Sequence, residues 1–256
     1  LALAPVSLRN LAVGGRLVLS TSGAGTNVYG GNNPDNPFGV ATEFDWVRGV
    51  PAFEAGDWRH EAERRTGRDL DASETSAFWL GETARSFAAD PLLHVGILWN
   101  KLRLSLGAYE VPDNHCYAWD RRYLPLLAWL PGFALLGSLG LAGLFLDWRG
   151  RHERAAVAAL FLLYLGTIVL TVTSDRVRLA LVPLLLPSAA RFVTTLPGLI
   201  RERPARAALA TLVAAALVLT PVLPREKRAE DLDERDFNLA GQLLDAGDLD
   251  GAEPLL

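Results

Sequence analysis

Two long stretches without a charged residue constrain the fold of this chain more than any other feature. They are Tyr123–Leu146, with 24 residues, and Ala155–Ser174, with 20. About 20 apolar residues are enough for a helix to cross the ~30 Å hydrocarbon core of a bilayer. Two further apolar stretches follow, of which the first contains Arg178 and Arg191. Because helices of a soluble core rarely lack charge over such lengths, we predict four transmembrane helices, at about 123–146, 155–174, 177–199 and 207–223.

The charged residues divide the chain into three blocks. Residues 7–122 carry 12 Lys/Arg and 15 Asp/Glu, residues 123–224 carry 9 and 4, and residues 225–256 carry 4 and 10. The mean hydropathy of +0.18 therefore averages a membrane block with two polar blocks. We expect a mainly α, polytopic α-helical membrane protein with a mixed outer-face domain over 7–122 and a helical tail over 225–256.

The loops between the predicted spans indicate the orientation. Residues 147–154 and 201–206 are short and rich in arginine, which is typical of cytoplasmic loops. Residues 7–122 and 225–256 then lie outside the cytoplasm. The chain contains no Met, and residues 1–6 look like the outer end of a preceding span, so we expect a piece of a longer protein.

The outer block begins with two segments that do not read as helices. Leu11–Ser20 alternates like a strand, and Asn27–Pro34 is dense in residues that favour turns. The run Asn32-Asn33-Pro34 is either a plain turn or a set of amide groups directed at a polar ligand. No glycine-rich phosphate-binding fingerprint is present.

Helices are expected in the rest of the outer block. Gly56–Arg68 is charged and helical in pattern, Glu74–Ala89 follows Ser73 as N-cap, and Pro91–Ala108 follows Asp90. The last of these is strongly apolar. It lies either in the membrane interface or beneath the outer domain.

The sequence gives little support for a metal site, a disulfide framework or a nucleic-acid partner. The potential ligands of Glu110–Cys116 match no zinc spacing. Cys116 is the single cysteine, which excludes a disulfide within the chain and a multi-cysteine cluster. The net charge of −4 gives no reason to expect nucleic acid.

Two arginines mark the point where an outer loop enters the third predicted span. Arg176 and Arg178 lie in Ser174-Asp-Arg-Val-Arg178. At a membrane boundary, arginine either extends to the interface or binds an anion. The second role would be that of a bidentate donor to a lipid-linked phosphate.

These motifs, taken in order, resemble a known family. Gly25-Thr-Asn-Val-Tyr-Gly-Gly-Asn-Asn-Pro34, Lys101, Tyr109-Glu110 and Asp175-Arg-Val-Arg-Leu-Ala-Leu-Val-Pro183 are similar to the C-terminal half of bacterial GT-C type glycosyltransferases. These are the family 39 or protein-mannosyltransferase-like multi-span enzymes. Val177 stands where the family usually has an aromatic residue between the arginines.

The resemblance implies a hexosyltransferase of the bacterial inner membrane. Such an enzyme moves a sugar from a polyprenyl-phosphate carrier to an acceptor on the outer face, and no other cofactor is implied. Its catalytic carboxylate lies in the N-terminal half, so no catalytic residue is expected in this chain. The implied carrier-binding and substrate-binding residues are Arg176, Arg178, Asn32, Asn33, Lys101 and Glu110.

The acidic tail resembles the start of a tetratricopeptide repeat. Ala240 and Ala252 lie 12 positions apart, with Leu239, Leu243 and Gly247 at compatible places. An acidic amphipathic helix next to the membrane is the simpler reading. The repeat supports an alternative function for the whole chain, that of a non-catalytic membrane anchor that presents a repeat array to a protein partner.

Cysteine labelling tests the predicted orientation. Arg149→Cys and Arg203→Cys should be protected from a membrane-impermeant thiol reagent, while Ser22→Cys and Asp231→Cys should react. The native chain, whose one cysteine is Cys116, gives the background. Labelling of the opposite pair would overturn the orientation.

Overall fold

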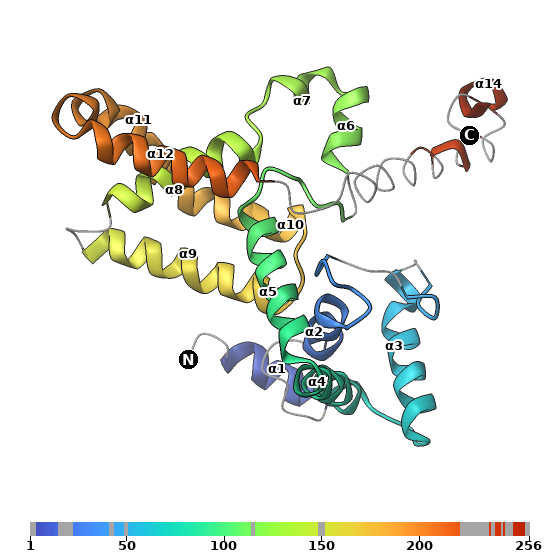
Figure 1. Ribbon diagram of the computed structural model, residues 1–256. Coiled ribbons are helices and arrows are strands. Elements are labelled where there is room, and N and C mark those ends of the chain that lie inside the picture. The colour runs from blue at the N-terminus through green and yellow to red at the C-terminus, as the bar shows by residue number, and fades with distance from the viewer. Residues whose placement is uncertain are drawn as a thin grey trace. The chain divides into compact units, whose positions relative to one another are not determined.

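The computed structural model describes residues 4–14, 23–40, 44–48, 51–113, 116–147, 152–220, 236, 239–241, 243 and 248–253. These residues are mainly helical, and none of them forms a strand. The chain divides into two compact units (Figure 1). One contains residues 1–99 with 170–172, and the other contains residues 100–169 with 173–256.

The first unit is built from helices. They are α1 (Ala4–Gly14), α2 (Ala24–Asn32), α3 (Pro51–Thr66), α4 (Ala72–Ala89) and the first part of α5 (Pro91–Leu106). The expected mixture of strand and helix in the outer block is therefore not found in its described part. Leu11–Gly14 ends α1 instead of starting a strand, and residues 15–20 lie outside the described residues. The helix α1 also runs through the boundary that was expected after residue 6.

Side-chain caps fix the starts of α4 and α5. The Asp71 carboxylate accepts hydrogen bonds from the N–H groups of Ser73 and Glu74, and the Glu74 carboxylate accepts one from the Asp71 N–H. This capping box places the N-cap at Asp71, so the assignment to Ser73 was wrong. The Asp90 carboxylate accepts from Leu93 N at 3.0 Å, with Pro91 as first helical residue, as the sequence predicted.

The glycine-rich segment that was expected to form turns is the helix α2. Its glycines are required by close packing, because a Cβ atom at Gly25 would overlap the Ser76 carbonyl oxygen in α4. A Cβ at Gly31 would overlap the carbonyl oxygen of Thr171. The glycines of α2 therefore permit close packing against neighbouring backbone, which larger side chains would prevent.

Aromatic side chains form the core of the first unit. Trp58 and Trp79 are buried in it together with Ala62 and Leu70. The Trp79 indole N–H donates to the Trp58 carbonyl at 3.1 Å, and Trp46 stacks on Trp79 with ring centroids 5.5 Å apart. Burial of an indole ring stays favourable when its N–H group has a hydrogen-bond partner.

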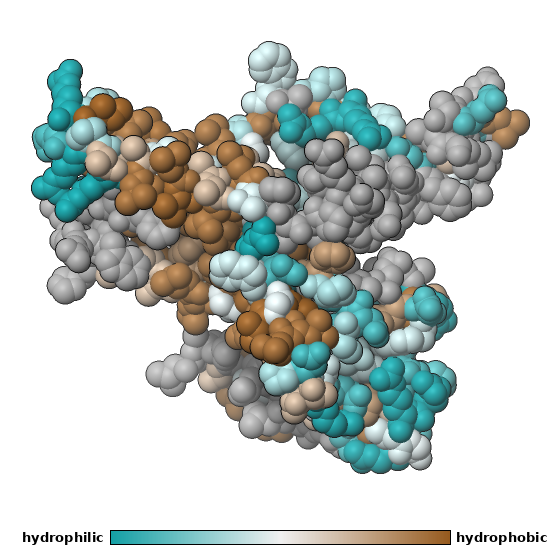
Figure 2. All heavy atoms as spheres, in the orientation of Figure 1, coloured by the Kyte–Doolittle hydropathy of each residue, from teal (hydrophilic) through white to brown (hydrophobic). Residues whose placement is uncertain are grey.

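The second unit contains the apolar helices. They are α6 (Tyr117–Tyr123), α7 (Pro125–Trp129), α8 (Phe133–Asp147), α9 (His152–Leu170), α10 (Asp175–Arg178), α11 (Val182–Glu202) and α12 (Pro204–Leu219). A short 3₁₀ turn, Leu179–Leu181, joins α10 to α11. Figure 2 shows hydrophobic residues over most of the visible surface of α11 and α12.

Among the described residues, one helical stretch is long and apolar enough to cross a membrane. It runs over α10, the 3₁₀ turn and α11, from Asp175 to Glu202. The stretch 123–146 is divided among α6, α7 and α8, with Pro125 at the first break and Pro131-Gly132 at the second. The apolar parts of α8, α9 and α12 are shorter than 18 residues. The four-span arrangement therefore stays a prediction, and residues 148–151 of one predicted cytoplasmic loop lie outside the described residues.

Close backbone approach joins α8 to α11. A Cβ atom at Gly143 would overlap the carbonyl oxygen of Ser188, and one at Gly140 would lie 2.7 Å from the Leu185 Cβ. Small residues permit such approach in apolar helix pairs, where van der Waals packing supplies the attraction. Around this contact lie the buried Leu141, Phe192 and Val218.

The described part of the tail is helical at residues 236, 239–241 and 243, and in α14 (Leu249–Ala252). Asp248 caps α14 by accepting a hydrogen bond from Gly251 N at 3.0 Å. The Asp236 carboxylate binds the Trp119 indole at 2.5 Å and Arg122 at 3.1 Å, both in α6. The repeat interpretation stays a prediction, and most of 225–247 lies outside the described residues.

Gly143→Ala tests the packing of α8 on α11. The added methyl group must push the helices apart, so we expect a loss of about 1–3 kcal/mol in unfolding free energy. Gly166→Ala in α9 is the control, since a Cβ there meets no atom within 4 Å. Alanine should stabilise that helix by about 0.5–1 kcal/mol. Thermal unfolding of the full chain in detergent measures both, and equal effects would contradict the close approach.

Candidate binding site

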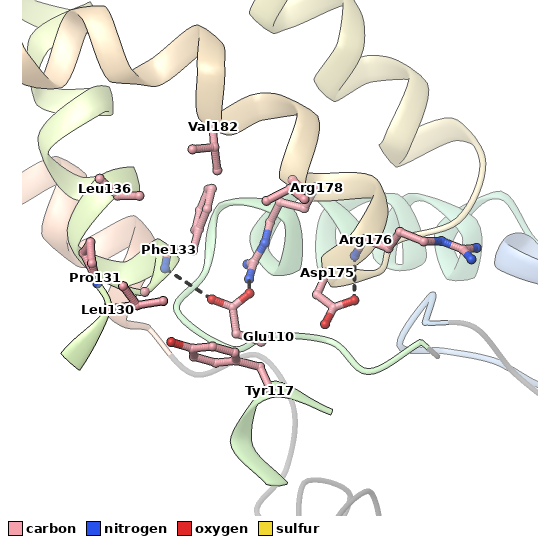
Figure 3. A pocket seen from close by; sticks show the side chains of 12 residues that line it. Glu110, Tyr117, Leu130, Pro131, Phe133, Leu136, Asp175, Arg176, Arg178 and Val182 are labelled. Carbon is pink, nitrogen blue, oxygen red and sulfur yellow. Dashed lines mark hydrogen bonds and ion pairs between the residues drawn. The ribbon is translucent and has the colours of Figure 1, made fainter. Parts of the chain in front are cut away.

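A cavity of about 440 Å³ opens in the second unit, beside the break between α7 and α8. Its lining combines residues from four places in the sequence: Glu110, Tyr117 of α6, the Leu130–Phe133 junction with Leu136, and Asp175–Val182 (Figure 3). Cavities of this volume hold a molecule or group the size of a small ligand.

A buried ion pair forms one wall of the cavity. An Nη2 of Arg178 contacts Oε2 of Glu110, and the Arg178 side chain is 2% exposed. Figure 3 shows the two side chains end to end. A buried guanidinium is tolerated when its charge is paired and its N–H groups have acceptors.

Arg178 also closes the end of α5. Its Nη1 donates to the carbonyl oxygens of Leu104 at 3.1 Å and Gly107 at 2.7 Å. The last carbonyls of a helix have no partner within the helix and carry partial negative charge. The Phe133 ring lies 4.2 Å below the guanidinium carbon, which adds a cation–π contact. The Arg178 guanidinium is therefore held by the protein on several sides.

Glu110 closes the start of α8 in the same way. Its Oε1 accepts a hydrogen bond from the backbone N–H of Phe133 at 3.2 Å. Phe133 is the first residue of α8, where the N–H groups lack helical partners and the dipole favours an anion. The ion pair thus links the negative end of α5 to the positive end of α8.

Arg176 lies at the rim of the cavity with its side chain 64% exposed. Its Nη2 is 3.1 Å from Oδ2 of Asp113, and that same oxygen accepts a hydrogen bond from Ser174 Oγ at 3.0 Å. An exposed pair of this kind contributes little to stability. Its guanidinium can exchange one anion for another at low cost, which the Arg178 guanidinium cannot do.

The remaining lining is apolar apart from Tyr117 and Asp175. Leu130, Pro131, Phe133, Leu136, Leu179 and Val182 supply the apolar side chains. Tyr117 lies opposite them in Figure 3, and its hydroxyl donates to the Leu127 carbonyl at 3.0 Å. The cavity therefore presents a hydrocarbon surface beside a charged rim, which suits an amphipathic molecule.

Lys101, one of the residues predicted for the site, is not among the residues that line this cavity. It is buried in α5, and its backbone carbonyl accepts the Ser105 hydroxyl at 2.8 Å. Burial lowers the pKa of the Lys101 ammonium to about 7, because the charged form loses its hydration.

Asn32 and Asn33 belong to the first unit, where both are buried. The Asn32 Nδ2 donates to the carbonyls of Val28 at 2.7 Å and Leu170 at 3.0 Å. The Asn33 Oδ1 accepts from Asp35 N at 2.9 Å, and its Nδ2 donates to Gly30 O at 3.3 Å. The amide groups of both residues bind backbone, and their assignment to a ligand stays a prediction.

The described residues contain no group of three His, Cys, Asp or Glu side chains placed to hold a metal ion. Asn114 and His115 of the Glu110–Cys116 segment lie outside them.

The structure thus brings together Arg176, Arg178 and Glu110 of the six predicted site residues. The sequence reading missed the opposite wall, formed by Tyr117 and the Leu130–Phe133 junction. A signal for it was present, because Pro131-Gly132 interrupts an otherwise uniform apolar run. A break at that point opens the space that a continuous helix would fill.

Comparison with known proteins identifies no relative. No protein-family model matches the chain, and no curated protein and no solved structure matches it either.

Glu110→Gln tests the ion pair. The substitution leaves Arg178 buried without a counter-charge, so we expect a loss of about 3 kcal/mol in unfolding free energy, near the lower end for a broken buried pair. The Glu110 side chain is 19% exposed, which reduces the expected loss in unfolding free energy. Asp113→Asn is the control. It removes only the exposed pair with Arg176 and should cost less than about 1 kcal/mol.

Thermal unfolding of the full-length chain in detergent measures both variants. Equal small losses for Glu110→Gln and Asp113→Asn would show that the buried pair does not hold these helix ends.

Proposed function

We propose that the cavity binds the phosphate and the first isoprene units of a polyprenyl-phosphate sugar. The chain is then part of a membrane glycosyltransferase that moves the sugar to an acceptor on the outer face of a bacterial inner membrane. The observation that carries the proposal is the pairing of an apolar wall with an exposed arginine at its rim.

The ligand and the cavity each have an apolar part and a charged part. A polyprenyl phosphate has a branched hydrocarbon chain that ends in a dianionic group. The wall formed by Leu130, Leu136 and Val182 suits the hydrocarbon, while Arg176 at the rim supplies a guanidinium for the phosphate oxygens. The rest of a long carrier would extend into the bilayer.

Under this proposal the two arginines have different roles. The Arg176 guanidinium points away from the apolar wall in Figure 3, and it contacts the phosphate after it turns from Asp113 toward the cavity, which the exposed ion pair permits. Arg178 positions the wall of the cavity through its contacts with Glu110, Leu104 and Gly107. Glu110 is committed to Arg178 and to Phe133 N, so it is assigned no proton transfer.

The apolar helices support placement in a membrane. Within the helical stretch from Asp175 to Glu202, only 22% of the most apolar 18 residues is buried inside the protein. A core helix of a soluble protein hides its apolar side chains, whereas a helix in lipid exposes them. Exposed leucines on neighbouring helices, such as Leu163 and Leu212, fit the same environment.

Binding of a long-chain polyprenyl phosphate to the full chain in detergent tests the proposal. Arg176→Ala should weaken binding about tenfold, which corresponds to the loss of one charge-assisted hydrogen bond. The same variant should bind the uncharged polyprenol as the native chain does. Val182→Trp fills the apolar wall and should weaken binding of both lipids.

Arg85→Ala serves as control, because it removes an exposed arginine of α4 that lies outside the cavity. Unchanged phosphate binding by Arg176→Ala and Val182→Trp would remove the cavity from the proposal. Absence of any carrier binding by the native chain, together with specific capture of a protein by residues 225–256, would favour the membrane-anchor alternative.

A further inference from the structure

One residue of the acidic tail, Asp236, binds helix α6 within the second unit. Its Oδ1 accepts a hydrogen bond from the Trp119 indole N–H at 2.5 Å, and its Oδ2 lies 3.1 Å from Nη1 of Arg122. The Asp236 side chain is only 21% exposed. A carboxylate gives up its hydration at low cost only where other donors replace the water. The donors of α6 therefore form a binding place for this carboxylate of the tail.

The helix presents its two donors side by side. Trp119 and Arg122 are three positions apart in α6, which places them on one face of the helix. The Trp119 ring packs on Tyr123 with ring centroids 4.5 Å apart. Hydrogen bonds to an ionised carboxylate are stronger than bonds between neutral groups. The contact with Asp236 is therefore directional, and it fixes one face of α6.

The same helix supplies part of the lining of the first cavity. Tyr117, the first residue of α6, lines that cavity. Figure 3 shows its ring on the opposite side from Leu136 and Val182. A movement of α6 would carry Tyr117 with it and change the opening of the cavity.

Packing alone holds α6 weakly. None of its seven residues is buried, and among the described helices it packs chiefly on the short helix α7. The Tyr117 hydroxyl joins the pair through the Leu127 carbonyl, while Leu126 and Trp129 of α7 are 74% and 87% exposed. A segment with few buried apolar contacts opens at a small fraction of the global unfolding free energy. A contact with Asp236 therefore has a large influence on how often α6 opens.

We infer that the tail, through Asp236, fastens α6 against the first cavity, and that release of the tail opens this cavity. The contacts with Trp119 and Arg122 connect a residue late in the chain to the helix that carries Tyr117. Any molecule that binds the released tail in preference to the fastened one shifts the equilibrium toward the open cavity. The inference concerns access to the cavity and does not depend on which ligand the cavity takes.

Cys116 reports the opening of α6 in the native sequence. It is the single cysteine of the chain, it is the N-cap residue of α6, and it is 2% exposed. We expect Asp236→Ala to label Cys116 with a maleimide about tenfold faster than the native chain does, in the full chain in detergent. A factor of ten corresponds to the loss of one charge-assisted hydrogen bond. Glu253→Ala removes an exposed acidic residue of the same tail and should label at the native rate.

A cysteine in the lining tests whether the cavity opens together with α6. Leu136 of α8 lines the cavity, so Leu136→Cys is introduced in a Cys116→Ser background. Adding Asp236→Ala to this variant should raise the labelling rate of the cavity cysteine about tenfold as well.

Trp119→Phe tests the contact itself, because it keeps an aromatic ring beside Tyr123 and removes the N–H group that Asp236 accepts. The double variant Trp119→Phe/Asp236→Ala should label Cys116 as fast as Asp236→Ala alone. Residues that act through one shared contact are not additive, whereas independent residues are.

Equal labelling of Cys116 in the native chain and in Asp236→Ala would overturn the inference, and so would an equal rise in Glu253→Ala. Faster labelling at Cys116 without faster labelling at Leu136→Cys would overturn the link between the tail and the cavity. Additive effects of Trp119→Phe and Asp236→Ala would overturn the assigned contact. A circular-dichroism melt of each variant confirms that it is folded. No lipid is added in these measurements, so a failure of the proposed carrier site is distinguishable from a failure here.

Discussion

The second unit depends on one ion pair, between Arg178 and Glu110. Two helix ends of opposite partial charge, the last turn of α5 and the first turn of α8, each need a partner for backbone groups that the helices leave unsatisfied. Arg178 serves the carbonyl end and Glu110 serves the N–H end, and the two side chains then neutralise each other. Neither charge has to be paired with water, so both helix ends can lie beside an apolar cavity. Removing Glu110 would leave the charge of Arg178 buried without its partner, so the helix ends beside the first cavity depend on this pair.

Helix α11 connects two chemically related places. Near its start lies the first cavity, which Val182 lines, and near its end lies a second cavity, which Leu199 and three arginines line. Between them α11 packs closely on α8, with Gly143 against the Ser188 carbonyl and Gly140 against the Leu185 side chain. The helix bears an apolar surface between two cationic regions. That arrangement suits a bilayer, whose hydrocarbon core lies between two layers of phosphate groups.

Much of the helical content could be predicted from the sequence, because helix caps and charge patterns within each segment indicate it. Asp90-Pro91 marked the start of α5, and the charge pattern around residues 56–68 marked α3. The failures came from contacts distant in sequence. Nothing near Gly25 and Gly31 indicates that the carbonyls of Ser76 and Thr171 occupy the space beside them, so the turn-forming residues predict turns where the structure has a helix. The first predicted span is not a single helix for a different reason: the absence of charge over residues 123–146 predicts a span, but it does not register the break at Pro131-Gly132.

The predicted site residues show the same contrast between local signals and contacts that are distant in sequence. Arg176, Arg178 and Glu110 were chosen from a motif and a resemblance, and they do meet at one cavity. The sequence did not reveal that Arg178 satisfies the end of α5, because that role depends on the carbonyls of Leu104 and Gly107. The polar character of Asn32 and Asn33 suggests a ligand, and their amide groups bind the backbone around them; a ligand role for either residue stays a prediction.

The asparagines and glycines of α2 carry a consequence for mutational scanning. Asn32 at the end of α2 donates a hydrogen bond to the backbone carbonyl of Leu170, and Gly31 leaves room for the adjoining Thr171 carbonyl. Substitutions along this helix would be poorly tolerated, and in an activity screen they would give the same loss as substitutions in a true ligand site. Protein abundance, measured alongside activity, separates the two causes, because a defect in packing lowers the amount of folded protein before it changes the turnover of each molecule.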